Sequence, residues 1–161
     1  MAILALTIFA FDQLTKLVVL HFLDHAEEKI VLSGFFKFVH WTNTGAAWSL
    51  FRDNNGLLAI VSAVALVALA LCRRRFEPQK TLGWISLGLI FGGIAGNLLD
   101  RVCRDNVVDF IYFYVDRREG GELGFPAFNV ADSAICIGVG LLFLLTFRSE
   151  SAAPAAEETK S

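Results

Sequence analysis

The sequence has few charged residues for its length. Only 19% of its 161 residues are charged and 55% are hydrophobic, and the mean hydropathy is +0.57. That balance is too apolar for a soluble domain of this size and is typical of a small polytopic membrane protein. The formal net charge of −2 also argues against a nucleic-acid partner.

Cysteine patterns and leader features are also missing. Cys72, Cys103 and Cys136 lie far apart and form no CxxC pair, so we expect no metal site, no cofactor and no disulfide framework. The apolar start of the chain has no basic residues before it and no small-residue cleavage site after it. We therefore expect a retained helix rather than a cleaved signal peptide.

Four apolar stretches are long enough to cross a bilayer, which takes about 20 residues. We expect spans at about 1–23, 56–72, 81–99 and 132–147, with outer loops at 24–55 and 100–131. Basic residues cluster from Arg73 onward, so the loop between the second and third spans should be cytoplasmic. Both termini are then cytoplasmic, and residues 148–161 should form a disordered cytoplasmic tail.

The outer loops carry strand patterns. Residues 29–32 and 35–42 resemble two strands around Ser33-Gly34, and residues 107–115 are rich in β-branched and aromatic side chains. Residues 116–124 are charged and glycine-rich, which is typical of a turn. The aromatic residues Trp41, Trp48 and Phe51 suit an interfacial belt.

Several polar residues lie in or beside the spans, where burying a charge costs about 3 kcal/mol or more. Asp12 and Lys16 are one helical turn apart and can pair on one face, either as a structural ion pair or as part of a site. The glycines at 88, 92 and 96 recur every four residues and predict close helix packing. Asn97 follows them, at a depth where an amide needs a partner.

Asp109 and Asp132 occur in apolar settings at the two ends of one short connection. Asn129 suits an N-cap, which would place Asp132 at the third position of the last helix. Taken singly, Asp109 could be a solvated loop residue and Asp132 a carboxylate that stabilises the helix dipole. If the two converge, they can share a proton and activate a water, as the aspartates of aspartic proteases do.

Five blocks, in order, resemble the bacterial lipoprotein signal peptidases (signal peptidase II), a family of four-span membrane aspartyl peptidases. The blocks are Asp12-Gln-Leu-Thr-Lys16, Asn43-Thr-Gly-Ala-Ala-Trp-Ser49, Gly92-Gly-Ile-Ala-Gly-Asn-Leu-Leu-Asp-Arg101, Val107-Val-Asp-Phe110 and Phe128-Asn-Val-Ala-Asp132. One departure is Trp48, which stands where Phe is common in the family. The resemblance covers Met1 to about Phe147.

The resemblance implies an all-α membrane protein, with four transmembrane helices and a small extracytoplasmic β-cradle, whose peptidase domain is residues 1–147. It implies an aspartic endopeptidase without a metal that removes the signal peptide from diacylglyceryl-modified prolipoproteins, just before the lipidated cysteine. The enzyme would be a multi-pass protein of the bacterial inner membrane with its active site at the outer face. Its partners would be the prolipoprotein and membrane lipids, and we expect a monomer.

The resemblance also assigns the site residues. Asp109 and Asp132 match the catalytic aspartates, and we expect Asp132, near a helix N-terminus, to be the base. The remaining motif residues should bind substrate or support the site: Asp12, Lys16, Asn43, Gly45, Asn97, Asp100, Arg101, Asn129 and Ala131.

Three other functions fit less well. A small transporter would show internal repeats and broken helices at the bilayer midplane, and the chain has no self-similar halves. A serine protease would need a GxS nucleophile and a His base, but no GxS occurs and His21, His25 and His40 all lie in or near the first loop. A structural subunit would not need the carboxylate pair.

Overall fold

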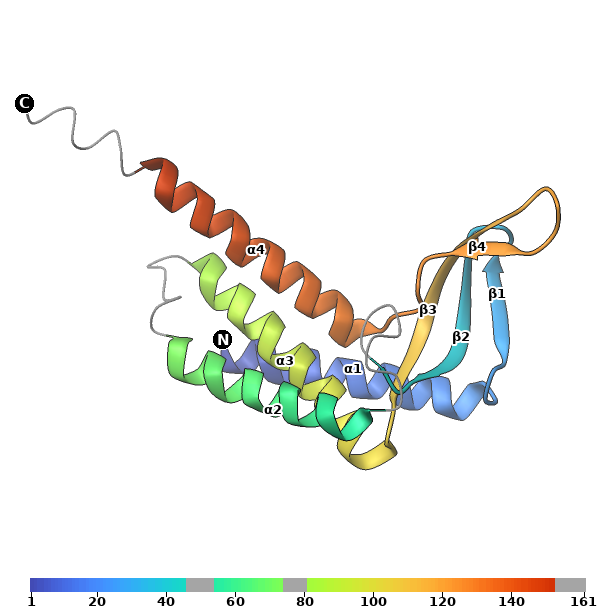
Figure 1. The fold of residues 1–161 in the computed structure, drawn as a ribbon, viewed down its shortest axis with the longest axis horizontal. Coiled ribbons are helices and arrows are strands. Elements are labelled where there is room, and N and C mark those ends of the chain that lie inside the picture. Colours follow the sequence, from blue (N-terminus) through green and yellow to red (C-terminus); the bar gives the residue numbers. More distant parts are fainter. Residues whose placement is uncertain (46–53, 74–80, 153–161) are drawn as a thin grey trace, which may run out of the picture.

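Each apolar stretch forms one helix, and the strands gather at one end of the helical bundle (Figure 1). The structure is a computed structural model that describes residues 1–45, 54–73 and 81–152. The elements in chain order are α1 (Ala2–Phe22), β1 (Glu28–Leu32), β2 (Phe36–Asn43), α2 (Asn55–Cys72), α3 (Thr81–Arg104), β3 (Val107–Asp116), β4 (Glu122–Gly124) and α4 (Val130–Ala152).

The helix α3 is the centre of the bundle and contacts each of the other three helices. Its glycines permit close approach: a Cβ added at Gly92 would lie 2.6 Å from the carbonyl oxygen of Ala5 on α1. A Cβ at Gly93 would lie 2.5 Å from the carbonyl oxygen of Ala131 on α4. The stripe of Gly88, Gly92 and Gly96 packs against α1, which confirms the close helix packing predicted for it.

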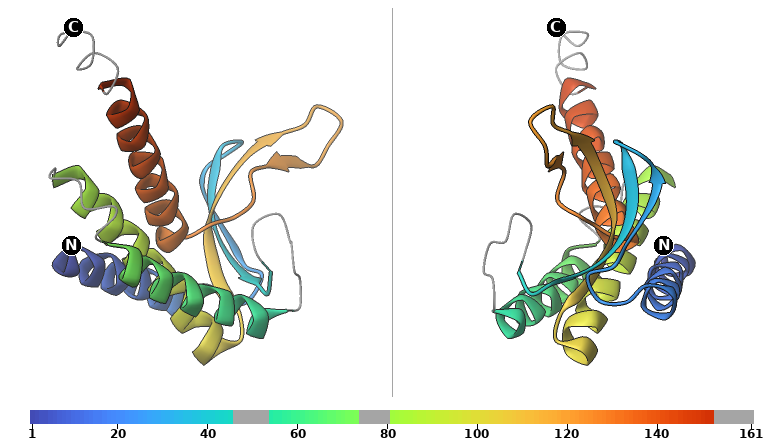
Figure 2. Two further views of the ribbon diagram at one scale, coloured as in Figure 1. Left: turned by 60° about the vertical axis from the view of Figure 1, so that its left-hand side comes forward. Right: turned by 90° about the vertical axis from the view of Figure 1, so that its right-hand side faces the viewer.

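The four strands form one antiparallel sheet in the order β1-β2-β3-β4, which projects from the end of the bundle (Figure 2). The hairpin between β1 and β2 turns at Gly34, whose φ of +71° suits glycine. The pairing of β2 with β3 sets Trp41 opposite Asp109. The first three strands confirm the strand patterns of the sequence.

Some boundaries differ from those expected. The helix α3 continues to Arg104, so Asp100 and Arg101 are helical rather than in the second loop; their polar side chains have partners inside the protein, and the helix need not end before them. Residues 122–124 pair with β3 as a fourth strand, so the predicted turn is shorter. The helix α4 continues to Ala152, into the segment predicted as a disordered tail; residues 153–161 lie outside the described residues.

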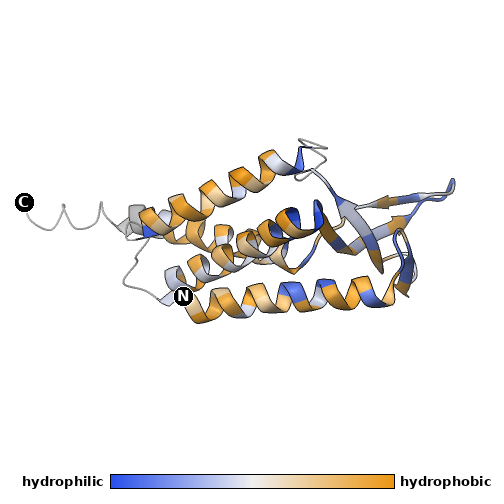
Figure 3. Cartoon of the chain, turned by 90° about the horizontal axis from the view of Figure 1, so that it is seen from below, coloured by the Kyte–Doolittle hydropathy of each residue, from blue (hydrophilic) through white to orange (hydrophobic). Residues whose placement is uncertain are grey.

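Within the described chain, four helices are long and apolar enough to cross a membrane: α1, α2, α3 and residues Val130–Phe147 of α4. Apolar residues dominate these helices, and hydrophilic residues concentrate toward the sheet (Figure 3). The start of α1 and the end of α4 both lie at the end of the bundle away from the sheet (Figure 1). The fold is thus a mostly helical membrane protein with a small antiparallel sheet at one end.

Candidate active site

Asp109 and Asp132 come together where β3 meets the first turn of α4, and Asn129 links them. The Asn129 side chain donates from Nδ2 to Asp109 Oδ1 at 2.8 Å. Its Oδ1 accepts from the Asp132 N–H at 3.0 Å, and the Asn129 N–H donates to Asp132 Oδ2 at 3.3 Å. This reciprocal cap confirms Asn129 as the N-cap and Asp132 as the third helical residue.

Asp109 is held in a largely dry environment. Asp109 is only 4% exposed, and its carboxyl accepts a second hydrogen bond from Asn43 Nδ2 at 3.0 Å. Burial, and then the negative charge of Asp132, raise the pKa of Asp109 to about 7. A carboxyl with that pKa keeps a large share of its proton at neutral pH, as a catalytic acid must.

Asp132 has a different set of partners. Asn97 Nδ2 donates to Asp132 Oδ1 at 2.7 Å, and Asn97 Oδ1 accepts from Lys16 Nζ at 3.0 Å. Because an ammonium can only donate, Lys16 fixes the amide of Asn97 with its NH₂ toward Asp132. Two N–H donors and the N-terminal end of α4 therefore face the Asp132 carboxylate.

Behind the pair lies a fully buried ion cluster. Lys16 contacts Asp12 Oδ2 and Asp100 Oδ2, each at 2.8 Å, and all three side chains are 0% exposed. Arg104 also pairs with Asp100, so two cations balance two carboxylates. The Asp12–Lys16 pair is thus both a buried ion pair and, through Asn97, part of the support of Asp132.

Arg101 connects the turn after β2 to the site. Its Nη2 donates to the carbonyl oxygen of Gly45 at 3.1 Å, and the Gly45 N–H donates to Asn43 Oδ1 at 2.9 Å. These bonds hold the amide of Asn43 against Asp109. Residues 46–53, which include Trp48 and Phe51, lie outside the described residues.

The structure gathers all eleven predicted site residues into one hydrogen-bond network. The last of them, Ala131, joins through its backbone, whose N–H donates to Asp12 Oδ1 at 2.9 Å. Their roles in binding or catalysis remain predictions. Within the described ranges, no three His, Cys, Asp or Glu side chains are grouped as metal ligands would be.

The network also includes side chains that were not predicted, among them Gln13, Asn55 and Arg104. Gln13 donates to Asp12 and Asp100, each at 3.1 Å, and accepts from Arg104 at 3.0 Å; an amide inside a span, next to Asp12, was an available signal. Asn55 donates to the carbonyl oxygen of Arg101 at 2.9 Å. Arg104 lies one helical turn after Asp100, with which it pairs, so that spacing was also an available signal. Asn55 gave no local signal, because Arg101 is 46 residues away.

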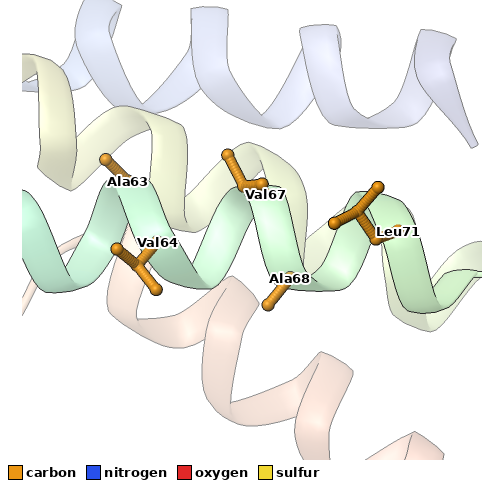
Figure 4. A pocket seen from close by; sticks show the side chains of 5 residues that line it. All are labelled: Ala63, Val64, Val67, Ala68 and Leu71. Atoms are coloured by element: carbon orange, nitrogen blue, oxygen red, sulfur yellow. The ribbon is translucent and has the colours of Figure 1, made fainter.

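Two apolar grooves lie on the helical surface, and neither contains the carboxylate pair. One, of about 360 Å³, is lined by Ala63, Val64, Val67, Ala68 and Leu71 of α2 (Figure 4). The other, of about 440 Å³, lies between α1 and the sheet, with Val18, Phe38 and Phe110 among its lining and Lys29 as its only charged residue. The candidate active site is therefore the polar network, and the grooves are apolar surfaces beside it.

Known proteins are similar to this chain in sequence and in fold. The family model described as signal peptidase (SPase) II matches residues 4–148. The chain is 37% identical over 145 residues to the lipoprotein signal peptidase of Geobacillus thermodenitrificans (strain NG80-2), covering 90% of this chain and 88% of the relative. It is 38% identical over 151 residues to that of Syntrophotalea carbinolica, covering 91% and 89%.

Two solved structures match the fold of this chain over most of its length. One bacterial membrane enzyme matches with a TM-score of 0.81 at 28% identity, over 94% of this chain and 89% of the other. A second matches with a TM-score of 0.74 at 30% identity, over 89% and 90%. The chain therefore belongs to the signal peptidase II family of proteases.

Proposed function

We propose that this protein removes the signal peptide of diacylglyceryl-modified prolipoproteins by hydrolysing the peptide bond just before the lipidated cysteine. Membership of the signal peptidase II family, whose members cleave signal peptides from prolipoproteins, supports this reaction. The observation that carries the proposal is the pair of buried carboxylates, Asp109 and Asp132, joined by Asn129. Such a pair can supply one acid and one base.

Asp132 acts as the base and Asp109 as the acid. Asn97 and the Asn129 N–H donate to the Asp132 carboxylate, whereas the pKa of Asp109, raised to about 7, keeps its proton available. Asp132 takes a proton from water as the water oxygen attacks the scissile carbonyl carbon. Asp109 protonates the carbonyl oxygen. As the C–N bond breaks, Asp132 gives its proton to the leaving amine, the carbonyl re-forms, and Asp109 takes back a proton from the hydroxyl oxygen.

The charge distribution supports a site at the outer face of the inner membrane. Arg73 ends α2 at the end of the bundle away from the sheet (Figure 1), and the sequence continues with Arg74, Arg75 and Lys80, which lie outside the described residues. By the positive-inside rule that end is cytoplasmic, as are both termini. The sheet and the carboxylate pair are then extracytoplasmic.

A lipid anchor would set the cleavage position. Each acyl methylene buried in the membrane contributes about 0.8 kcal/mol, so two chains hold the modified cysteine firmly at the interface. The apolar surfaces of the spans receive the acyl chains. Trp41, which is opposite Asp109 in the sheet and packs on Tyr112, clamps the extended peptide together with Trp48, which lies outside the described residues. All predicted site residues come from one chain, so a monomer suffices.

The test compares one prolipoprotein with and without its diacylglyceryl group, at equal concentration in one detergent. We expect the lipidated form to be cut with a much higher kcat/KM, just before the modified cysteine, and Asp109→Asn to cut neither form. Cleavage of the unlipidated form at a similar kcat/KM would show that the anchor does not set the position.

A further inference from the structure

Lys16 is a buried cation whose hydrogen-bonding capacity is fully used. A lysine ammonium has three donors, and those of Lys16 meet Asp12 and Asp100 at 2.8 Å and Asn97 at 3.0 Å. Removing such charges from water costs several kcal/mol for each ion, and apolar side chains of similar volume often stabilise a fold as well or better. Stability alone therefore does not account for this cluster.

Both carboxylates that hold Lys16 also accept a hydrogen bond from the backbone beside a catalytic aspartate. Asp12 Oδ1 accepts from the N–H of Ala131 at 2.9 Å, one residue before Asp132. Asp100 Oδ2 accepts from the N–H of Val108 at 3.4 Å, one residue before Asp109. Each bond fixes a peptide plane that ends at the Cα of Ala131 or Val108. The catalytic aspartate is the next residue of α4 or β3, so the bond restrains it through the regular backbone of that element.

The glycine stripe of α3 makes room for this arrangement. A Cβ added at Gly96 would lie 2.5 Å from Asp12 Oδ2, so α3 can approach α1 closely enough only without a side chain there. Gln13 completes the contact by donating to the carbonyl oxygen of Gly96 and to Asp12, each at 3.1 Å. Asp12 is thus fixed between α1, α3 and the start of α4.

From this geometry we propose that Asp12, Lys16 and Asp100 form a positioning triad that sets the separation of Asp109 and Asp132 through their backbones. The triad joins the backbone of α4 to that of β3 by four contacts: Ala131 to Asp12, Asp12 to Lys16, Lys16 to Asp100, and Asp100 to Val108. This inference rests on the proposed function and adds to it the contacts that keep the two carboxylates at the separation that catalysis needs.

The separation can be measured in the pH dependence of kcat. Two carboxylates that interact titrate as a pair, and the interval between the two limbs of the pH profile grows with their proximity. Among the described residues, the other charges acting on the pair include Lys16 and Asp12 of α1 and Arg101 of α3. Removing one of these charges shifts the pKa values of both carboxylates, and so both limbs of the pH profile, in the same direction. A change in the distance between the two carboxylates instead changes the interval between the limbs.

The experiment uses the full chain in detergent with a lipidated prolipoprotein. Asp12→Leu and Asp100→Leu each remove a backbone acceptor. Asp100→Asn keeps an oxygen that can face both Lys16 and the Val108 N–H, as Oδ2 of Asp100 does. We expect the Leu variants to lose about 100-fold in kcat, the effect of misplacing reacting groups by about 1 Å. The KM of the Leu variants should change little, and the interval between the two limbs of their pH profile should narrow. Asp100→Asn should recover about tenfold or more of the kcat lost in Asp100→Leu and most of the interval.

Lys37→Met is the matched control, because Lys37 is also a buried lysine between two carboxylates but none of its hydrogen bonds reaches the pair. It should leave the interval unchanged. If a Leu variant does not fold, Asp12→Ser replaces it, since serine is too short to reach Ala131. An unchanged interval in the Leu or Ser variants, or an Asp100→Asn variant no better than Asp100→Leu, would overturn the positioning role. Failure of the unmodified protein to cut the substrate would instead overturn the proposed function.

Discussion

In the described part of the chain, the bundle and the sheet each contain a buried lysine held by two carboxylates, and the two clusters differ in their exposure to water. In the bundle, Lys16 and its partners Asp12 and Asp100 are all 0% exposed. In the sheet, Lys37 is 3% exposed, but its partners Glu28 and Glu122 are each 37% exposed. Lys37 also lies over the rings of Tyr112 and Tyr114.

We therefore expect the two clusters to have different roles. The Lys37 cluster holds strands together, and the Lys16 cluster positions the carboxylate pair. The glutamates around Lys37 keep part of their hydration, so the cluster needs only to join β1, β2 and β4. The carboxylates around Lys16 have no access to water, so every oxygen must find a donor inside the protein. Two of those donors are the backbone N–H groups one residue before Asp109 and Asp132, the proposed catalytic aspartates.

The largest effect should come from the pair that the Lys16 cluster supports. Asp109→Asn and Asp132→Asn should each lower kcat by about three orders of magnitude or more, because hydrolysis needs an acid and a base together. Lys37→Met should keep activity within about tenfold, since no ion-pair contact of Lys37 reaches the pair. Cleavage of a lipidated prolipoprotein measures this, with thermal unfolding in detergent to check the fold. A chelator should not change the rate, and inhibition reversed by added metal would contradict the mechanism.

The two lysines should also differ in their contribution to stability. Lys16→Met leaves two buried carboxylates without their shared cation and should cost about 3–5 kcal/mol. Lys37→Met leaves two partly hydrated glutamates and should cost about 1 kcal/mol. Thermal unfolding of the two variants in the same detergent gives the comparison; equal shifts in Tm would remove the distinction between the clusters.

Between about pH 6 and 9, pH should change the rate of catalysis but not the ion pairs of Lys37 with Glu28 and Glu122. Asp109 has a pKa raised to about 7, mainly by burial, so kcat should fall as pH rises through 7 and the acid loses its proton. Burial lowers the pKa of Lys37, but the bonds to Glu122 and Glu28 outweigh it and raise the pKa above 10.5. A raised lysine pKa adds stability that is fully present below 10.5 and is lost only as pH rises above it.

Profiles of kcat and Tm between about pH 6 and 9 check both statements. The fall of kcat above pH 7 should have the same midpoint in Lys37→Met as in the unmodified protein. A midpoint that moves in Lys37→Met would mean that the sheet cluster acts on the carboxylate pair after all.

The smallest expected effect concerns the two ends of the bundle. Cys103, near the sheet end of α3, and Cys72, at the opposite end of α2, are both exposed. A membrane-impermeant thiol reagent added to cells with a permeable outer layer should label Cys103 and not Cys72. Labelling of Cys72 alone would mean that the sheet faces the cytoplasm.

Much of this site could be predicted where partners are close in sequence. Asp12 and Lys16 are one helical turn apart, and Asn129 and Asp132 form a cap within one turn. Strand alternation predicted β2, in which Lys37 and Val39 are buried and Phe36 and Phe38 are partly exposed. For the distant members of the site, the resemblance to a family identified residues that periodicity could not connect.

The remainder depends on contacts between remote segments. Lys37 meets Glu122 across 85 residues, and Gln13 meets Arg104 across 91, so no local pattern reveals either pair. Strand β4 has only three residues, all exposed, and it forms because β3 offers an edge to pair with. The end of α3 at Arg104 likewise depends on partners for Asp100 that α1 supplies.

The most direct test of the account is whether Asp109 and Asp132 act as one unit. The measurement is kcat for lipidated prolipoprotein with Asp109→Asn, with Asp132→Asn and with the double variant, each shown to be folded by its Tm. A pair that shares one proton fails when either member is lost, so the double variant should be little slower than the slower single variant. Losses that multiply in the double variant, or a single variant that keeps near-normal turnover, would contradict the account.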